Sequence, residues 1–248
     1  MGLPRRSFVA LVVAFAGAAL SRSAPASPPP PEAPPPCPTG MVLVAGARCP
    51  ELEHVCKRWL DPPPYQNLRC AEFERAPRCK GAREPVRYCV DRDERAEAGS
   101  ALPRVSVSWL EAKAACEAAG ARLCTEREWE HACEGDEGRP YPYGFTRDSS
   151  ACNIDRTGLG APGGGLKDLR APITAYERCT SPYGVHDMTG NVDEWVLREG
   201  APVGSRSVLR GGWWLPGRNR CRAATIGHGE GYSGKQVGFR CCADARAP

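Results

Sequence analysis

The stretch VSWLEAKAACEAAGARLCTEREWEHACEG, residues 107–135, contains two complete helix-start signals. Ser108 and Glu111 have the spacing of a capping box, and so do Thr125 and Glu128. In such a box the first side chain accepts a backbone N–H three residues on, and the acid binds back to the cap. The sequence therefore predicts two helices with defined starts, which set the framework for the rest of the chain.

Each predicted helix carries one face of small or aromatic residues. On the first helix this face ends at Gly120, and on the second it ends at Gly135. The members of the two faces are Ala112, Ala115, Cys116 and Ala119 on the first helix and Trp129, Ala132 and Cys133 on the second. These faces are the sides by which we expect the helices to pack.

Outside these helices the sequence predicts only short strands. MVLVAG (41–46) stops at a glycine, and VRYCVDRDE (86–94) alternates as a strand does. After the second helix, Gly, Pro, Asn and Asp recur too often for long elements, which leaves short strands at 192–197, 207–210 and 237–242. The fold class we expect is α+β, irregular and sheet-poor, with loops held by cystines.

The composition divides the chain into three further parts. Residues 27–36 are dominated by proline and should form an extended linker. Residues 37–248 have the size of one large domain. Within it, residues 47–85 are rich in Cys, Pro and Arg without an apolar period, so we expect a loop-like insert that disulfides hold in place.

The N-terminus has the features of a removable signal peptide, residues 1–26. Arg5 and Arg6 precede an apolar run, Phe8–Leu20, and Ala24-Pro25-Ala26 gives a small-x-small cleavage signal. The run is shorter than the roughly 20 residues that a membrane helix needs, so no membrane span should remain after cleavage. The alternative is an uncleaved anchor.

Charge and cysteine content narrow the partners and the compartment. Without residues 1–26 the formal net charge falls from +4 to +1, because Arg5, Arg6 and Arg22 are lost, and a near-neutral chain is a poor match for nucleic acid. All 14 cysteines follow the signal peptide, and none forms a Cys-x-x-Cys pair. They predict disulfides rather than a zinc or redox motif, in a secreted or periplasmic protein.

HDMTGNVDEW, residues 186–195, concentrates oxygen donors around Gly190. The donors are Asp187, Asn191, Asp193 and Glu194. A hard cation such as Ca²⁺ binds such side-chain oxygens together with backbone oxygens, although the spacing is not that of an EF-hand. The alternative is a hydrogen-bonded Asx turn that leads into a strand burying Trp195, and composition alone favours the turn.

RGGWWLPGRNRCRAA, residues 210–224, combines aromatic rings with arginines. The residues that could form a ligand surface are Trp213, Trp214, Arg218 and Arg220. Aromatic and Arg side chains bind ligands together, yet they also form self-contained cores. The stretch holds no acid and no histidine, so it offers no group for acid–base catalysis. A core strand and loop is the simpler interpretation.

Several segments together resemble the sulfatase-modifying factor family, the formylglycine-generating enzymes and their bacterial relatives, which share a C-type-lectin-like fold. The segments, in the family's order, are MVLVAG, VSWLEAKAACEAAGARLCTEREWEHACEG, YPYG, YGVHDMTGNVDEW, LRGGWW and VGFRCCAD. The likeness covers residues 86–244 and extends to 41–46. The insert at 47–85 looks particular to this chain.

The resemblance implies two core disulfides and a calcium loop. The disulfides would join Cys116 to Cys241 and Cys133 to Cys221, while the other ten cysteines cannot be paired from sequence. The calcium ligands it implies are the side chains of Asp187 and Glu194, the backbone oxygens of Gly190 and Val192, and, for a second site whose other ligands do not align, Asn153 and Ile154. Asp193 stands where the family usually has Trp.

The resemblance also exposes a departure in the chemistry. Formylglycine-generating enzymes place two cysteines between the R-G-G corner and the later structural cysteine, and these soft thiolates bind the Cu(I) that works with O₂. Here the interval reads WWLPGRNR, residues 213–220, with no cysteine before Cys221. We therefore expect calcium as the cofactor and no copper.

These observations predict an exported, calcium-binding domain that acts in binding a protein, peptide or other extracytoplasmic ligand. The surface we expect it to use lies near Trp213, Trp214, Arg218 and Arg220. The competing hypothesis is a formylglycine-generating oxidase that modifies a cysteine of a sulfatase or another extracytoplasmic substrate. A purely structural envelope module is a third class.

Overall fold

The computed structural model describes residue 2 and residues 35–65, 68–96 and 99–247. The expected signal peptide, 1–26, and most of the linker lie outside the described residues. The strands are β1 (Met41–Arg48), β2 (Glu51–Glu53), β3 (Cys56–Trp59), β4 (Cys70–Phe73), β5 (Arg78–Lys80), β6 (Glu84–Asp91), β7 (Arg122–Leu123), β8 (Asp193–Leu197), β9 (Ser207–Arg210), β10 (Ala224–Thr225), β11 (Val237–Phe239) and β12 (Cys241–Asp244). The helices are α1 (Trp109–Ala118) and α2 (Glu126–Glu134).

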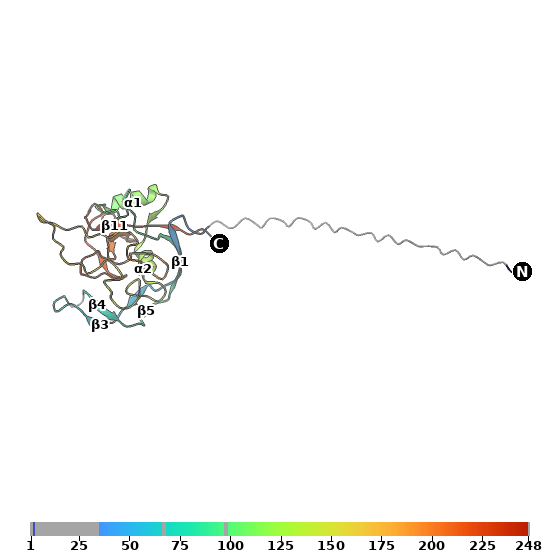
Figure 1. Ribbon diagram of the computed structural model, residues 1–248, viewed down its shortest axis with the longest axis horizontal. Coiled ribbons are helices and arrows are strands. Elements are labelled where there is room, and N and C mark those ends of the chain that lie inside the picture. Colours follow the sequence, from blue (N-terminus) through green and yellow to red (C-terminus); the bar gives the residue numbers. More distant parts are fainter. Residues whose placement is uncertain (1, 3–34, 66–67, 97–98, 248) are drawn as a thin grey trace. The chain divides into compact units, whose positions relative to one another are not determined.

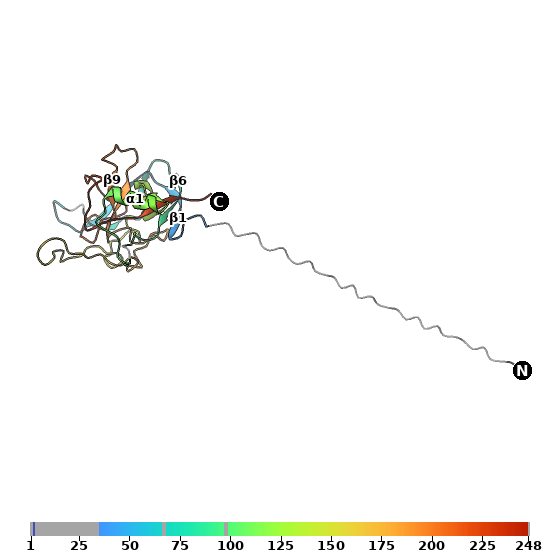
Figure 2. The same ribbon diagram turned by 90° about the horizontal axis from the view of Figure 1, so that it is seen from above.

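Two four-stranded sheets form the framework, in the orders β1-β6-β12-β7 and β10-β9-β8-β11. All pairs are antiparallel except β11 with β8. The longest pair, β1 with β6, runs side by side along its whole length (Figure 2). Short strands, two helices and many disulfides confirm the expected irregular α+β fold (Figure 1).

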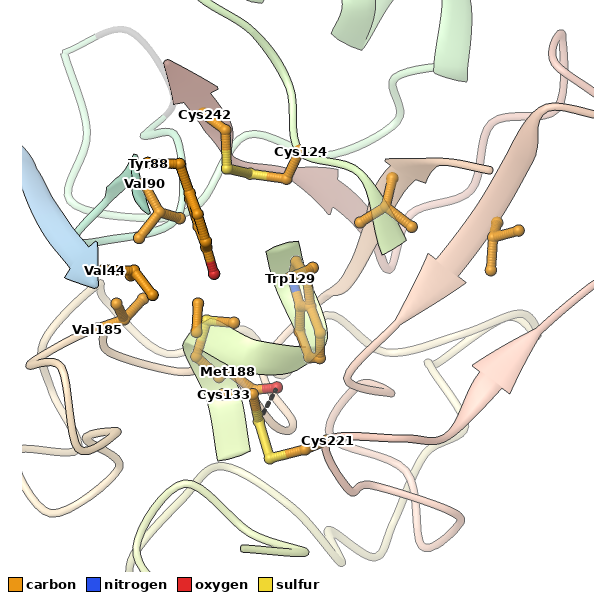
Figure 3. Packing of buried hydrophobic residues seen from close by; sticks show 13 residues of the cluster. Val44, Tyr88, Val90, Cys124, Trp129, Cys133, Val185, Met188, Cys221 and Cys242 are labelled. Atoms are coloured by element: carbon orange, nitrogen blue, oxygen red, sulfur yellow. Dashed lines mark hydrogen bonds between the residues drawn. A yellow bond between two sulfur atoms is a disulfide. The ribbon is translucent and has the colours of Figure 1, made fainter. Parts of the chain in front are cut away.

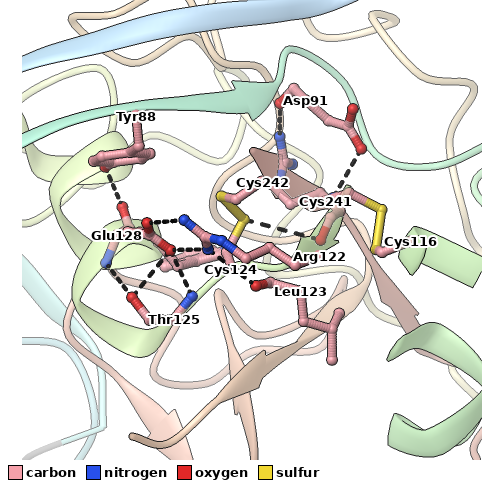
Figure 4. The surroundings of a disulfide bond; sticks show 12 residues. Tyr88, Asp91, Cys116, Arg122, Leu123, Cys124, Thr125, Glu128, Cys241 and Cys242 are labelled. Carbon is pink, nitrogen blue, oxygen red and sulfur yellow. Dashed lines mark hydrogen bonds and ion pairs between the residues drawn. A yellow bond between two sulfur atoms is a disulfide. The ribbon is translucent and has the colours of Figure 1, made fainter. Parts of the chain in front are cut away.

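Both helices start at the expected capping boxes. Ser108 Oγ accepts the Glu111 N–H at 3.2 Å, and the Ser108 N–H donates back to the Glu111 carboxylate at 2.7 Å. Thr125 and Glu128 form the same reciprocal pair (Figure 4). At ten and nine residues, neither helix is long enough to cross a bilayer, and no other helix in the described ranges is.

Two hydrophobic clusters fill the space between helices and sheets. One places Trp129 of α2 against Met188, Val196 and Val208, with the Cys133–Cys221 disulfide at its edge (Figure 3). The other places Trp109, Ala112 and Cys116 of α1 against strands β8, β9 and β11. The predicted face of α2 is buried as a whole. On α1, Ala112 and Cys116 of the predicted face are buried together with Trp109, whereas Ala115 is partly buried and Ala119 is exposed.

All 14 cysteines form disulfides, so no thiol is free. The pairs are Cys37–Cys89, Cys49–Cys79, Cys56–Cys70, Cys116–Cys241, Cys124–Cys242, Cys133–Cys221 and Cys152–Cys179. Both pairs that the resemblance implies are present. Consecutive residues of β12 bind different partners, because Cys241 joins α1 and Cys242 joins the turn before α2 (Figure 4).

The expectation of a loop-like insert at 47–85 is wrong in one respect. Two small antiparallel sheets, β2 with β5 and β3 with β4, lie within it, and these strands lie away from α1 (Figure 1). The Cys49–Cys79 and Cys56–Cys70 disulfides do hold the segment. These strands have only three or four residues and are held by disulfides. They can therefore pair without the alternating apolar pattern by which a strand is predicted from sequence.

The expected end of the first strand is also wrong. Strand β1 continues through Gly46 to Arg48. A Cβ at residue 46 would lie 2.3 Å from Asp136 Oδ1 and 2.4 Å from the Tyr183 hydroxyl. The glycine therefore allows two side chains to approach the strand, and it does not terminate it.

A buried ion pair joins the two halves of the framework. Arg240, between β11 and β12, is 0% exposed, and Glu194 of β8 is 1% exposed. The guanidinium forms two bonds of 2.6 Å with the Glu194 carboxylate. It also donates to the carbonyls of Asp91, at the end of β6, and His186, while the Trp129 indole N–H donates to Glu194 at 2.6 Å. One pair thus connects both sheets and α2.

Replacing Arg240 by methionine should destabilise the protein by about 3–5 kcal/mol, because Glu194 would stay buried without a counter-ion. The matched control is Arg127→Met, which breaks an exposed pair with Glu199 and should cost no more than about 1 kcal/mol. Guanidinium unfolding with the disulfides intact measures both. Equal losses for the two variants would contradict the central role of the buried pair.

Candidate functional site

The loop that carries the expected calcium ligands makes a tight turn before β8. Asp187 and Asn191 have positive φ angles of 53° and 54°, which Asp and Asn tolerate better than most residues. Gly190 lies so close to the next segment that a Cβ would come within 2.5 Å of the Asn153 carbonyl oxygen. The Asn191 N–H donates to the same carbonyl at 3.0 Å. Close backbone packing therefore fixes the path of this loop.

Three buried carboxylates gather at the loop and face one guanidinium. Burial raises the pKa of Asp187 to about 6, although the Arg240 charge opposes the rise. Burial also raises the pKa of Glu94 well above its usual value, and the charges of Asp187 and Glu194 raise it further. Asn191 Nδ2 donates to Glu94 at 2.6 Å. When all three acids are ionised, their negative charge exceeds what Arg240 can neutralise.

The two expected side-chain ligands differ in their fitness for a cation. Asp187 Oδ1 is buried without a hydrogen-bond partner among the described residues, so it is a free hard donor of the kind that Ca²⁺ prefers. Glu194 is already bound by Arg240 and Trp129. The Asp187 side of the loop fits a cation, and Glu194 would have to share its carboxylate between that cation and Arg240.

No three His, Cys, Asp or Glu side chains in the described ranges form a group that could hold a metal. The expected calcium site differs from such a group, because it combines only two carboxylates with two backbone oxygens. Asn153, expected at a second calcium site, forms side-chain hydrogen bonds within the fold. Its Nδ2 donates to the Leu169 carbonyl, and its Oδ1 accepts from Arg156. Ile154 is fully buried beside the Cys152–Cys179 disulfide. These contacts give both residues a structural role.

The expected ligand surface is only partly exposed. Trp214 is 0% exposed, which corrects its assignment to that surface. Trp213 and Trp214 stack edge to face, with ring centroids 5.1 Å apart. Because neighbouring residues point to different sides of the chain, only Trp213 reaches partly into solvent. Arg218 is exposed and Arg220 is half-buried.

The two arginines of this surface have no counter-ion. No ion pair forms at Arg218 or Arg220 within the described part of the chain, whereas the nearby Arg147 pairs with Asp155. Burial lowers the pKa of Arg220, and the positive charges of Arg218 and Arg147 lower it further. Both guanidiniums can therefore donate hydrogen bonds to acceptor groups of a ligand.

A cavity of about 250 Å³ opens beside Trp213. The apolar side chains that line it include Leu68, Leu209, Trp213, Leu215 and Pro216. The exposed Arg218 also lines it, and so does Asp193, the first residue of β8. Burial raises the pKa of Asp193 to about 7, the Gly212 N–H opposes the rise by donating to the carboxylate, and the Glu194 charge adds to it.

Asp193 and Leu68 are among the lining residues that were not predicted for this surface. Asp193 could have been found, because a charged residue in place of the family's Trp is visible in the sequence. Leu68 could not, because it belongs to the insert at 47–85, and no pattern there indicates contact with residues 212–219. The chain-specific insert thus contributes to the cavity.

A second cavity, of about 660 Å³, lies between β6, α1 and α2. Six basic and five acidic side chains line it. All five acids form ion pairs, including Glu128 with Arg122 and Glu199 with Arg127. Its acids are thus paired within the protein, whereas the smaller cavity is lined by Asp193, which forms no ion pair within the described residues.

The site contains no thiolate. Cys221, the first cysteine after the R-G-G corner, is joined to Cys133 of α2. The interval that separates the corner from Cys221 instead forms the wall of the smaller cavity. A soft-metal site built from two cysteines of this segment therefore has no ligands in this chain.

Comparison with known proteins identifies relatives of this chain. Over 158 residues the chain is 34% identical to a mouse protein named Inactive C-alpha-formylglycine-generating enzyme 2. The aligned region covers 59% of this chain and 51% of the mouse protein. Over 166 residues it is 30% identical to the Formylglycine-generating enzyme of Bos taurus. That alignment covers 57% of this chain and 44% of the bovine enzyme. The chain thus spans about half the length of these relatives.

Among solved structures, CarF is similar in fold, with a TM-score of 0.57 and 14% identity over 84% of this chain and 98% of CarF. Residues 65–245 match the Sulfatase-modifying factor enzyme 1-like domain. That match covers most of the chain, including both capped helices, the loop at 187–194 and the cavity wall. The chain belongs to the sulfatase-modifying factor family.

Proposed function

We propose that this protein is an extracytoplasmic binding domain of the family that does not carry out copper-dependent oxidation. The observation that carries the proposal is the interval at 213–220, which has no thiolate pair and lines a recess of about 250 Å³. Its ligand is a protein or peptide that contacts Trp213, Arg218 and Arg220. Two independent lines of support follow, one from sulfur chemistry and one from surface chemistry.

The sulfur chemistry argues against oxidation. Cu(I) is held in proteins by soft thiolate or thioether ligands, and every cysteine of this chain is in a disulfide. The mouse relative at 34% identity carries the word inactive in its name, which supports the same conclusion for this chain. The bovine relative is named as an active enzyme, so oxidation is the alternative that must be tested.

The surface chemistry favours binding. Trp and Arg are the residues that most often dominate the energy of protein interfaces, and here a half-exposed Trp213 lies beside two arginines without counter-ions. The recess next to them gives a ligand side chain a place to enter. Seven disulfides in one domain are typical of oxidising compartments, which supports a secreted or periplasmic location.

Calcium is the second part of the proposal. The ligands would be the Asp187 and Glu194 side chains with the backbone oxygens of Gly190 and Val192. The free Asp187 oxygen and the excess of buried negative charge support it, since Ca²⁺ would supply two positive charges. The ion would stabilise the loop, and through β8 it would stabilise the floor of the cavity.

Incubation of the purified protein with Cu(I), O₂ and a Cys-x-Pro-x-Arg peptide should leave the peptide mass unchanged. The bovine formylglycine-generating enzyme, run in parallel, is the positive control. Appearance of a formylglycine product with this chain would overturn the proposal and establish the oxidase alternative.

A displayed library of linear peptides, selected on the purified protein, should yield binders that depend on Trp213. We expect Trp213→Ala to weaken their binding at least tenfold, because it removes the aromatic anchor. Trp59→Ala, which removes a partly exposed tryptophan of the insert, should leave binding unchanged. Binders insensitive to Trp213, or no enrichment over an unrelated protein, would contradict the assigned surface.

Removal of calcium by a chelator should lower the thermal unfolding midpoint by several degrees, because an ion that binds only the folded state stabilises it by mass action. Asp187→Ala removes the side-chain oxygen and should abolish this shift, whereas Glu137→Gln, a change at an exposed acid, should preserve it. An unchanged midpoint in the wild-type protein would rule the ion out.

A further inference from the structure

We propose that the cavity beside Trp213 receives a lysine or arginine side chain of the bound peptide, with the Asp193 carboxylate as its counter-ion. This inference rests on the proposed binding function and names the chemistry that the site selects. The family usually has tryptophan where this chain has Asp193.

Asp193 is a buried acid without a cation. It is 5% exposed, and the Gly212 N–H is its hydrogen-bond donor. Several other buried acids have arginine partners: Asp91 pairs with Arg95, Glu134 with Arg222 and Glu230 with Arg206. Glu94 and Asp187, at the loop before β8, share with Asp193 the lack of such a partner within the described residues. Within the described ranges no basic side chain forms such a pair with Asp193. A buried carboxylate without a counter-ion costs free energy that a cationic ligand would recover.

The carboxylate lines the cavity and not the calcium loop. Successive side chains of a strand point to opposite faces, so Glu194 turns to Arg240 while Asp193 turns to the other side of β8. There it shares the cavity with Leu209, which lies on the neighbouring strand β9. Asp193 is therefore available to a ligand even when the loop at 187–194 holds an ion.

The size and walls of the cavity suit one long basic side chain. Its volume, about 250 Å³, is below the roughly 300–1,000 Å³ of pockets that enclose a whole small molecule. Leu209, Leu215 and Pro216 supply apolar surface for a methylene stem, as Lys and Arg stems prefer. The half-buried Trp213 ring adds an aromatic face that attracts a cation. Stem and charge thus each have a complementary part of the cavity.

Arg218 does not cancel this preference. Its side chain also lines the cavity, but it is exposed, so solvent and salt screen its charge. The ligand charge would lie instead at the buried carboxylate, where screening is weak. Arg218 remains free to bind a carbonyl or an acidic residue beside the inserted side chain.

The test uses three acetylated, amidated pentapeptides, Gly-Ala-Xaa-Ala-Gly, in which Xaa is lysine, arginine or norleucine. Norleucine keeps the apolar stem of lysine and lacks its charge. Titration into ¹⁵N-labelled protein, followed by the amide and indole N–H signals, measures even weak binding. We expect the lysine and arginine peptides to shift the Gly212 and Trp213 signals with a Kd at least tenfold lower than that of the norleucine peptide.

Asp193→Asn keeps the shape of the side chain and removes its charge. The affinity of this variant for the lysine peptide should therefore fall to its affinity for the norleucine peptide. Glu137→Gln removes an exposed acid and should change nothing. Equal binding of lysine and norleucine peptides, with sensitivity to Trp213→Ala retained, would overturn this inference and leave the proposed function standing. Absence of shifts with all three peptides, together with failure of the peptide selection, would overturn both.

Discussion

The buried bond between Arg240 and Glu194 fixes the register of β8, and both functional features depend on that register. With Glu194 turned inward to the guanidinium, Asp193 must face the cavity, and the loop before the strand must bring Asp187 to the same guanidinium. A slip of one residue would exchange the two faces, burying Asp193 against Arg240 and opening Glu194 to the cavity. The orientation of Glu194 toward Arg240 and that of Asp193 toward the recess are therefore two outcomes of one strand position.

A second set of charges, on α2, holds the 210–224 segment in place. It pairs with some arginines of the segment and leaves others without an acidic partner. Three glutamates of α2, spaced four residues apart, lie on one helix face. Glu126 and Glu130 bind Arg210, Glu130 also binds Arg48, and Glu134 binds Arg222. These pairs are largely buried, so their value lies in fixing geometry more than in net stability. Arg218 and Arg220 lie outside this set, which is why they remain available to a ligand.

Local signals made much of the framework predictable. The two capping boxes are complete within four residues each, so neither needs tertiary information. The short strands expected at 192–197 and 207–210, in the intervals that frequent turn residues leave, are observed as Asp193–Leu197 and Ser207–Arg210. The strands of the insert were missed because backbone pairing and disulfides hold them. Trp214 was misplaced because sequence alone does not tell which of two adjacent rings is covered. The cavity was beyond prediction for a similar reason: Leu68 and Asp193 are 125 residues apart in the chain and meet only through the tertiary fold.

The disulfide pattern also has a mechanical meaning. Tension applied to the two ends of the described domain would pass from Cys37 directly to Cys89, and from Cys116 directly to Cys241. Between Cys37 and Cys241, only residues 90–115 lie outside these covalent shortcuts. Fully extended, that segment spans at most about 90 Å, whereas the helix α2, the loop at 187–194 and the cavity wall all lie inside the Cys116–Cys241 loop. A load between Cys37 and Cys241 could therefore bypass α2 and the loop at 187–194, which the Cys116–Cys241 disulfide encloses.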